Sequence, residues 1–270
     1  MARFLFGGVV NVHDPGLLKG AEGVTLEQVC ADNTEISDRF SGRRRLGRTQ
    51  RVTGASHSGW NNLDETLALF VQSGVLKRLN PDHTATSIKT LTSNGRMSYE
   101  EVNGVVICSN GIDIGMIDGG AWYDMGSTSK NFKQVTPAAR HITFFNGRVF
   151  GALGSLISHN DPYNLEESDK RKCQIPVPGD VCMLQAVDGG IWFSTDKEIV
   201  FLAGTGPEDF TYQVKANYQA VPYACKLEYG ERLPGLNLTG RVAIFGTTQG
   251  LCVGSGSGQL VNLSQAKVSF

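Results

Sequence analysis

The chain has 270 residues, of which 40% are hydrophobic and 19% are charged, and its formal net charge at pH 7 is −1. This apolar content excludes an intrinsically disordered chain and predicts a packed core. The near-zero charge excludes a global positive field that would hold nucleic acid or an anionic membrane, so any such contact has to be local.

The first twenty residues are expected to form an N-terminal arm (residues 1–20) outside the main domain. Their apolar run, Phe4 to Val10, contains two glycines and lacks the h-region and cleavage site of a signal peptide. No apolar window of about 18 residues, the length of a membrane-spanning helix, occurs in the sequence. We therefore expect neither secretion by the standard route nor a membrane-spanning segment.

The most basic stretch of the chain follows this arm, next to Gly42 and Gly47. It contains Arg43, Arg44, Arg45, Arg48 and Arg51. Such a run is typical of a solvated or partner-paired loop, and contact with phosphate groups is the alternative. We interpret these arginines as a candidate interface or DNA-facing patch, with any DNA contact made in passing.

Residues 21–270 are predicted to form one continuous domain of β-hairpins. Asn-Gly, Asp-Gly and Ser-Gly pairs separate short apolar runs, as type I′ turns require because both central residues have positive φ. The turn glycines are Gly74, Gly111, Gly147, Gly190 and Gly250. Most of their spacings of 37, 36, 43 and 60 residues lie near the length of one propeller blade, about 40 to 50 residues.

The predicted fold class is therefore all-β: a β-propeller-like array of about five to six four-stranded antiparallel blades, with little helix. Only a stretch near Leu63 to Phe70 has amphipathic helical character, and its flanking turns favour a strand. Because the hairpin spacing is irregular, a β-sandwich is the alternative.

Residues 158–180 interrupt the hairpin pattern with a polar stretch, which we interpret as a long loop or insertion. Long loops on a rigid β scaffold often carry binding surfaces. The residues of this candidate binding loop are His159, Asn160, Asp161, Tyr163 and Asn164.

The sequence lacks the signatures of common catalytic sites, including G-x-S-x-G, H-E-x-x-H and the P-loop. Ser56 and His57 are adjacent, but neighbouring residues of an extended chain point to opposite faces. The acids Asp118 and Asp188 occupy turn positions that aspartate favours. We expect no catalytic residues and no enzyme activity; the weakest alternative, a propeller glycoside hydrolase, requires two acids about 5 to 9.5 Å apart.

The six cysteines are scattered, with no C-x-x-C pair and no histidine at zinc spacing. We therefore expect reduced thiols, no metal site and no cofactor. Trp60, Trp122 and Trp192 occupy similar places relative to the hairpins, and we expect them to pack between blades.

Four passages share their order and pattern with one group of proteins. They are residues 22–47, where Leu46 stands in place of an expected proline; residues 144–164, which end in S-x-x-D-P-x-N; residues 188–204; and residues 248–264. In this order they resemble the propeller-type structural proteins of tailed bacteriophages, the group that includes packaged-DNA stabilisation and tail-hub proteins.

The resemblance implies a structural virion protein that forms part of the tail or head-tail connection through protein-protein interfaces. Its expected partners are copies of itself in a cyclic homo-oligomer and other tail or neck proteins, after assembly in the host cytoplasm. The alternative is a carbohydrate-binding tail-tip adhesin, in which loop aromatics such as Tyr163 or Tyr123 stack on sugars.

Overall fold

The structure is a computed structural model that describes residues 34–36, 42–44 and 53–264, apart from positions 63, 65, 127–131 and 234–235. Of the arginine run, Arg43 and Arg44 lie in a described strand, whereas Arg45, Arg48 and Arg51 lie outside the described residues.

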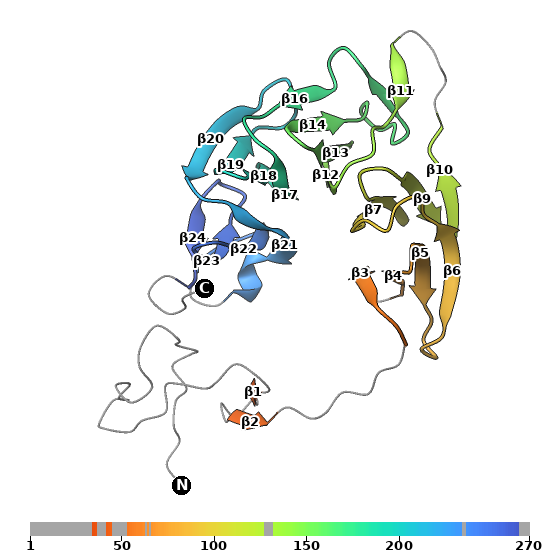
Figure 1. The fold of residues 1–270 in the computed structure, drawn as a ribbon. Coiled ribbons are helices and arrows are strands. Elements are labelled where there is room, and N and C mark those ends of the chain that lie inside the picture. Colours follow the sequence, from red (N-terminus) through yellow and green to blue (C-terminus); the bar gives the residue numbers. More distant parts are fainter. Residues whose placement is uncertain are drawn as a thin grey trace.

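Five four-stranded antiparallel sheets follow one another around an arc (Figure 1). The first contains β3 (Ser56–Asn61), β4 (Ala68–Gln72), β5 (Val75–Leu79) and β6 (Ala85–Thr90). The second contains β7 (Ser98–Val102), β8 (Val105–Ser109), β9 (Ile114–Asp118) and β10 (Ala121–Asp124). The third contains β12 (His141–Phe145), β13 (Arg148–Leu153), β14 (Leu156–His159) and β16 (Gln174–Pro176).

The fourth sheet contains β17 (Val181–Val187), β18 (Gly190–Thr195), β19 (Ile199–Ala203) and β20 (Thr211–Ala216). The fifth contains β21 (Ala220–Tyr229), β22 (Arg241–Thr247), β23 (Gly250–Gly254) and β24 (Leu260–Asn262). Two further pairs are β1 (Thr34–Ile36) with β2 (Gly42–Arg44) and β11 (Lys133–Val135) with β15 (Glu167–Asp169). Within the described residues, the 3-10 turn η3 (Gly230–Arg232) is the only helical element.

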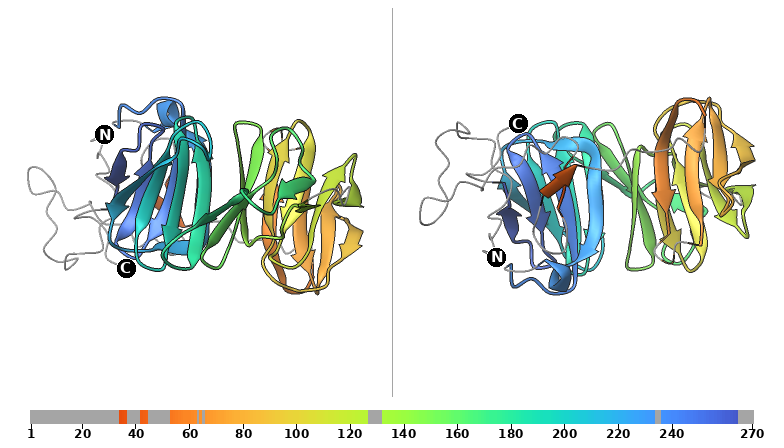
Figure 2. Two further views of the ribbon diagram at one scale, coloured as in Figure 1. Left: turned by 90° about the horizontal axis from the view of Figure 1, so that it is seen from above. Right: turned by 90° about the horizontal axis from the view of Figure 1, so that it is seen from below.

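In four of the sheets the strands pair with their neighbours along the chain; in the third, β14 pairs with β16, and the intervening β15 pairs with β11. The five sheets stand side by side around a common axis (Figures 1 and 2). This is the arrangement of a β-propeller, as the hairpin pattern predicts, and not the two packed layers of a β-sandwich.

Of the glycines predicted to lie in turns, Gly147 does so, whereas Gly190 and Gly250 do not. Asn146 and Gly147 have φ angles of 43° and 78°, as a type I′ turn requires. Gly190 and Gly250, however, are the first residues of β18 and β23 rather than turn residues. The long spacing before Gly250 arises because η3 and its loop lie between β21 and β22.

Residues 158–180 are not one long loop. They include β15 and β16, and β16 supplies the outermost strand of the third sheet. Their polar composition hid these strands because each is only three residues long and has no alternating apolar pattern.

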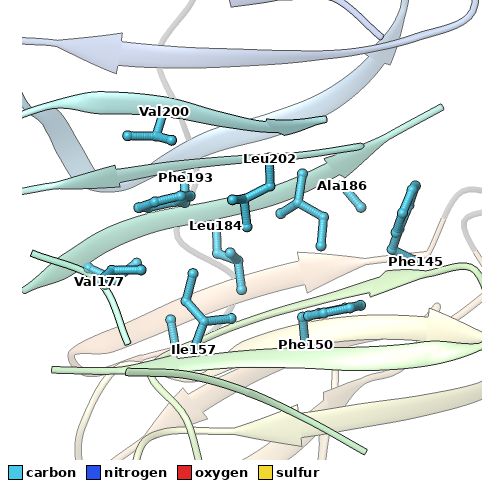
Figure 3. Close-up of a cluster of buried hydrophobic side chains, with 12 residues drawn as sticks. Phe145, Phe150, Ile157, Val177, Leu184, Ala186, Phe193, Val200 and Leu202 are labelled. Atoms are coloured by element: carbon cyan, nitrogen blue, oxygen red, sulfur yellow. The ribbon is translucent and has the colours of Figure 1, made fainter. Parts of the chain in front are cut away.

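The core is divided into apolar layers between adjacent sheets. In the layer shown in Figure 3, Phe145, Phe150 and Ile157 of the third sheet meet Leu184 and Phe193 of the fourth. Each fully buried side chain of this size contributes about 1.5–3 kcal/mol to folding. The sheets are therefore held together face to face, as in the other layers of the arc.

The tryptophans pack in these layers. Trp192 is fully buried between the fourth and fifth sheets, and its Nε1–H donates to the Ser255 carbonyl at 2.9 Å. Trp60 stacks on Tyr99 between the first two sheets, with ring centroids 5.6 Å apart. Trp122 is partly buried in the same layer.

A recurring hydrogen bond joins neighbouring sheets near the axis. Side-chain oxygens of Ser58, Glu100 and Thr143, each on the innermost strand of its sheet, accept the backbone N–H groups of Met97, Phe144 and Ala186 at 2.9, 3.0 and 2.9 Å, respectively. Gln185, the next position in the series, accepts a contact from the Cys225 thiol at 4.0 Å. These acceptors recur every 42 or 43 residues, which is a more regular period than that of the turn glycines.

Candidate functional site

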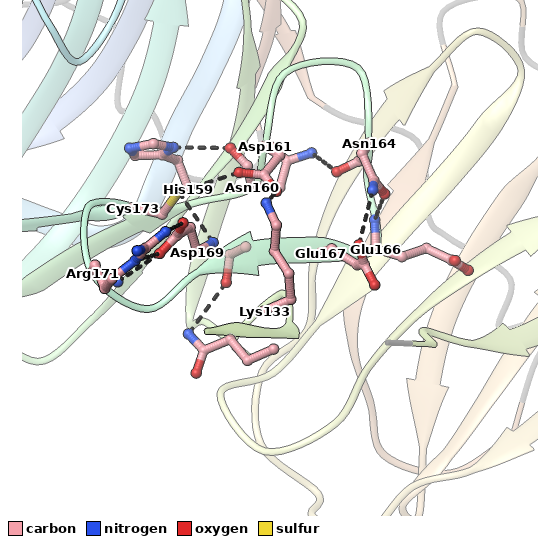
Figure 4. A network of polar contacts seen from close by, with 12 residues as sticks. Lys133, His159, Asn160, Asp161, Asn164, Glu166, Glu167, Asp169, Arg171 and Cys173 are labelled. Atoms are coloured by element: carbon pink, nitrogen blue, oxygen red, sulfur yellow. Dashed lines mark hydrogen bonds and ion pairs between the residues drawn. The ribbon is translucent and has the colours of Figure 1, made fainter. Parts of the chain in front are cut away.

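The candidate binding loop is folded against the third sheet, and its polar groups bond mainly to one another (Figure 4). Asn160 is fully buried. Its Oδ1 accepts the N–H of Val149, and its Nδ2 donates to the carbonyl of Asn164 at 2.6 Å. The Asn160 amide therefore connects the loop to β13 and to its own later residue Asn164.

Two ion pairs tie the same segment to its surroundings. Asp161 pairs with Lys133 of β11, and the guanidinium of Arg171 forms a bidentate pair with Asp169, with N–O distances of 3.0 and 2.7 Å. The hydrogen bonds from Arg171 hold the pKa of the Asp169 carboxyl well below its usual range. These charges are therefore satisfied within the protein.

His159 is buried beside the ring of Phe150, with centroids 5.4 Å apart. Its Nδ1 lies 2.9 Å from the carbonyl of Asn160, to which it donates, while Nε2 is buried without a hydrogen-bond partner among the described residues. Burial lowers the pKa of this imidazole, so the ring is neutral at pH 7. The structure thus gives His159 a packing role.

Tyr163 is the most exposed aromatic residue of the described chain. Its side chain is 87% exposed, its N–H donates to the Gly147 carbonyl at 2.7 Å, and its ring covers Gly147, where a Cβ would lie 2.8 Å from the ring. Its φ of 58° is unusual for a residue of this size. The exposed ring therefore lies over the β12–β13 turn.

A second candidate site, which the sequence did not indicate, lies on the axis. A cavity of about 330 Å³ opens where the innermost strands of the sheets converge, and its lining includes Trp60, Arg96, Tyr99, His141, Gln185 and Tyr223. The rings of His141 and Tyr223 are 4.6 Å apart, and the Arg96 guanidinium lies 5.3 Å from the Tyr223 ring centroid. The cavity thus combines aromatic walls with one cation.

The axial cavity offers recognition groups rather than proton-transfer groups. Burial lowers the pKa of His141 to about 4, so this imidazole is neutral at pH 7. No acid is among the lining residues. A second cavity of about 500 Å³ contains one acid, Asp188, which pairs with Arg241 at 2.8 Å. Neither cavity holds the two carboxyls that glycoside hydrolysis needs.

Surface apolar groups gather where the second and third sheets meet. Ile112 is 63% exposed and Leu153 is 43% exposed. Leu153 Cδ1 lies 3.4 Å from the place of a Cβ on Gly111, the residue before Ile112. Exposed apolar residues that cluster in this way are characteristic of contact surfaces between proteins.

The described residues also bear on the expected thiols, metal sites and membrane-spanning segments. In the described part of the chain, the five cysteines form no disulfide, and no three His, Cys, Asp or Glu side chains come together in a group that would hold a metal ion. None of the described helical segments is long and apolar enough to cross a membrane.

Comparison with known proteins supports the fold. No family model and no curated protein match the chain. Solved structures that match include the extracellular domains described as belonging to a one component system and to a hybrid two component system of B. thetaiotaomicron. The first has 12% identity and a TM-score of 0.51 over 85% of this chain and 33% of the other; the second has 11% identity and a TM-score of 0.52 over 83% and 29%.

The WD40 domain of Neurospora crassa Pan2 also matches, with 14% identity and a TM-score of 0.46 over 77% of this chain and 65% of the other. The chain spans a third or less of the length of the B. thetaiotaomicron domains. At these identities the similarity concerns the fold alone. The order and arrangement of the sheets define the chain as a β-propeller protein.

Proposed function

We propose that the chain is a structural virion protein of a tailed bacteriophage, and that it contributes to the tail or head-tail connection through protein-protein interfaces. Two kinds of observation support this proposal. The order of four sequence passages, from residues 22–47 to residues 248–264, resembles the propeller-type structural proteins of these particles. The surface exposes apolar side chains, and the charges of Asp161 and Asp169 in the candidate binding loop segment are paired within the chain.

The single observation that carries an interface role is the exposed apolar pair, Ile112 and Leu153. Ile112 lies in the short connection between β8 and β9, and Leu153 is the last residue of β13, so little backbone entropy is lost when a partner covers them. In the assembled particle this surface contacts another copy of the chain or a neighbouring tail or neck protein.

Light scattering and particle incorporation test the proposal with the variants Ile112→Asp and Leu153→Asp. Each places a charge in the contact surface, and we expect self-association or incorporation to weaken about tenfold or more. Asp118→Asn, at an exposed turn of the second sheet, is the matched control. If both apolar variants assemble like the parent protein, the surface is not the interface.

The second candidate function is carbohydrate binding at a tail tip, which the exposed ring of Tyr163 favours. Stacking on an exposed tyrosine needs no further rearrangement of the loop. Glycan-array binding that disappears in Tyr163→Ala but persists in Tyr229→Ala, another exposed tyrosine, would support this function. If no glycan binds the parent protein, the adhesin alternative fails.

The proposed contact with passing DNA rests on the run from Arg43 to Arg51. Contact with phosphates releases counterions, so binding should weaken steeply with salt. Titration of duplex DNA at increasing salt concentration measures this slope. Salt-independent association would contradict the DNA-facing interpretation.

A further inference from the structure

The arc of five sheets ends in two apolar faces that no other described sheet covers. In the first sheet, Leu69, Val71 and Leu76 pack against the second sheet. Because side chains alternate along a strand, Ala68, Phe70 and Leu79 lie on the opposite face. They line an apolar cavity of about 500 Å³ at the end of the arc.

The fifth sheet has an equivalent face. Phe245 and Cys252 pack against the fourth sheet, so their neighbours Ile244 and Leu251 point away from it. Leu251 is 39% exposed, and Val221 lies beside Gly246 on the same side, 3.8 Å from the place of its Cβ. Loop residues after β21 cover part of this face, and the rest remains open.

Both faces border the same opening. Residues of β3 and β21, the innermost strands of the first and fifth sheets, line one axial cavity, so the two end sheets belong to one ring. Figure 1 shows the ring open between these two sheets, and the views of Figure 2 place them at opposite ends of the arc. Closing a propeller requires that the first and last blades be covered.

The repeat period indicates which segment is available to cover the two faces. The acceptors Ser58, Glu100 and Thr143 define a period of about 42 residues. Gly16 lies one such period, 42 residues, before Ser58. The strands β5 and β6 begin 17 and 27 residues after Ser58. The strands β1 and β2 begin 18 and 26 residues after Gly16 and pair antiparallel.

By their spacing along the chain, β1 and β2 correspond to the third and fourth strands of a preceding repeat. The segment that contains them leads into β3, which lies at the edge of the opening.

We propose that the segment of residues 1–52 docks between the first and fifth sheets of the same chain. In this arrangement, the segment covers Phe70 and Leu79 on one side and Leu251 and Val221 on the other.

Cleavage of the full chain tests this docking. A specific protease site is inserted at the exposed positions 53–55, the protein is cleaved after folding, and size-exclusion chromatography follows the released peptide. We expect the peptide of residues 1–52 to stay with the remainder of the chain under native conditions and to separate in denaturant. A peptide that separates under native conditions would overturn the proposal.

Two variants locate the docking surface. Phe70→Asp and Leu251→Asp, on the two end faces, should each weaken retention of the cleaved peptide about tenfold or more, because each places a charge in the covered surface. Val214→Asp is the matched control, because Val214 is 48% exposed on β20, away from the opening. Phe70 is partly buried, so loss of retention in Phe70→Asp alone would indicate misfolding of the first sheet. Leu251 is more exposed, so the docking is supported if Leu251→Asp loses retention and contradicted if its retention is unchanged.

Light scattering of the uncleaved protein distinguishes closure within one chain from exchange between chains. Retention of the peptide in a monomer supports closure within one chain. If retention occurs only in dimers, and mixed cleaved and labelled subunits exchange their peptides, the opening is filled by a second copy and the proposal is wrong.

Discussion

The inter-sheet acceptor Glu100 makes the stability of this propeller depend on pH in a predictable direction. Its Oε1 accepts the N–H of Phe144, 3.0 Å away on the next sheet. Burial raises the pKa of the Glu100 carboxyl from 4.5 to about 7, although the Phe144 N–H and the charge of Arg241 act in the opposite direction. The carboxyl is therefore protonated in the folded protein at pH values where the unfolded chain has lost this proton.

Between pH 4.5 and about 7, the folded state binds more protons at Glu100 than the unfolded state does. Its contribution to stability therefore falls as the pH rises through this range. Above pH 7, the ionised group costs the fold up to about 3 kcal/mol, from 1.36 kcal/mol for each unit of pKa. Glu100→Gln keeps an acceptor for Phe144 and removes the charge.

We expect Glu100→Gln to be more stable than the parent protein at pH 8 by about 1–3 kcal/mol and to differ little from it at pH 5. Urea denaturation at pH 5, 6, 7 and 8 measures the difference. Glu101→Gln, at the exposed neighbouring position, is the control and should change stability by less than about 0.5 kcal/mol. A Glu100→Gln protein that is less stable at pH 8 would refute the reasoning.

Three further predictions concern packing and the loop. His141→Phe should reduce the loss of stability between pH 6.5 and 4, because the buried neutral imidazole has a pKa of about 4 and must charge on acid unfolding; parallel acid titrations followed by fluorescence measure this. Gly254→Ala should cost about 1–3 kcal/mol, because its Cβ would lie 2.5 Å from the Trp192 ring, whereas Gly59→Ala meets nothing within 4 Å; equal denaturation midpoints would contradict this. Asn160→Ala should lower the free energy of unfolding by about 1–3 kcal/mol and speed proteolysis within residues 158–180. An unchanged cleavage rate would contradict the role of the Asn160 amide in holding this loop.

The hairpins could be predicted because local chemistry determines them. Asn146-Gly147 has the residue types and positive φ angles of a two-residue turn, and the flanking strands, β12 and β13, are apolar. Repeated hairpins of this kind indicated a propeller without any knowledge of long-range contacts. The fold class was therefore accessible from the sequence.

The ring period and the axial cavity could not be predicted in the same way. Ser58, Glu100 and Thr143 are three different residue types, and they share only a place on the innermost strand and an acceptor oxygen. Turn glycines gave a less regular period because connections such as residues 230–240 differ in length. Ser58 and Glu100 lie in the polar strands β3 and β7, so no apolar pattern marked the series.

The candidate binding loop shows a different limit of sequence reasoning. Polar residues between strands indicate a surface, but they do not distinguish groups that face a ligand from groups that pair internally. Asn160 and His159 are buried, and Asp161 is paired with Lys133, whereas Tyr163 is exposed. Only the three-dimensional arrangement separates these roles, because the partners come from β11 and β13.

The most direct test of the proposed function is immunoelectron microscopy of intact tailed phage particles with an antibody raised against this chain. We expect label confined to the tail or the neck, at a site that also loses density in particles assembled without the protein. Particles that contain no label, from cells in which the protein is abundant, would contradict a structural role in the virion.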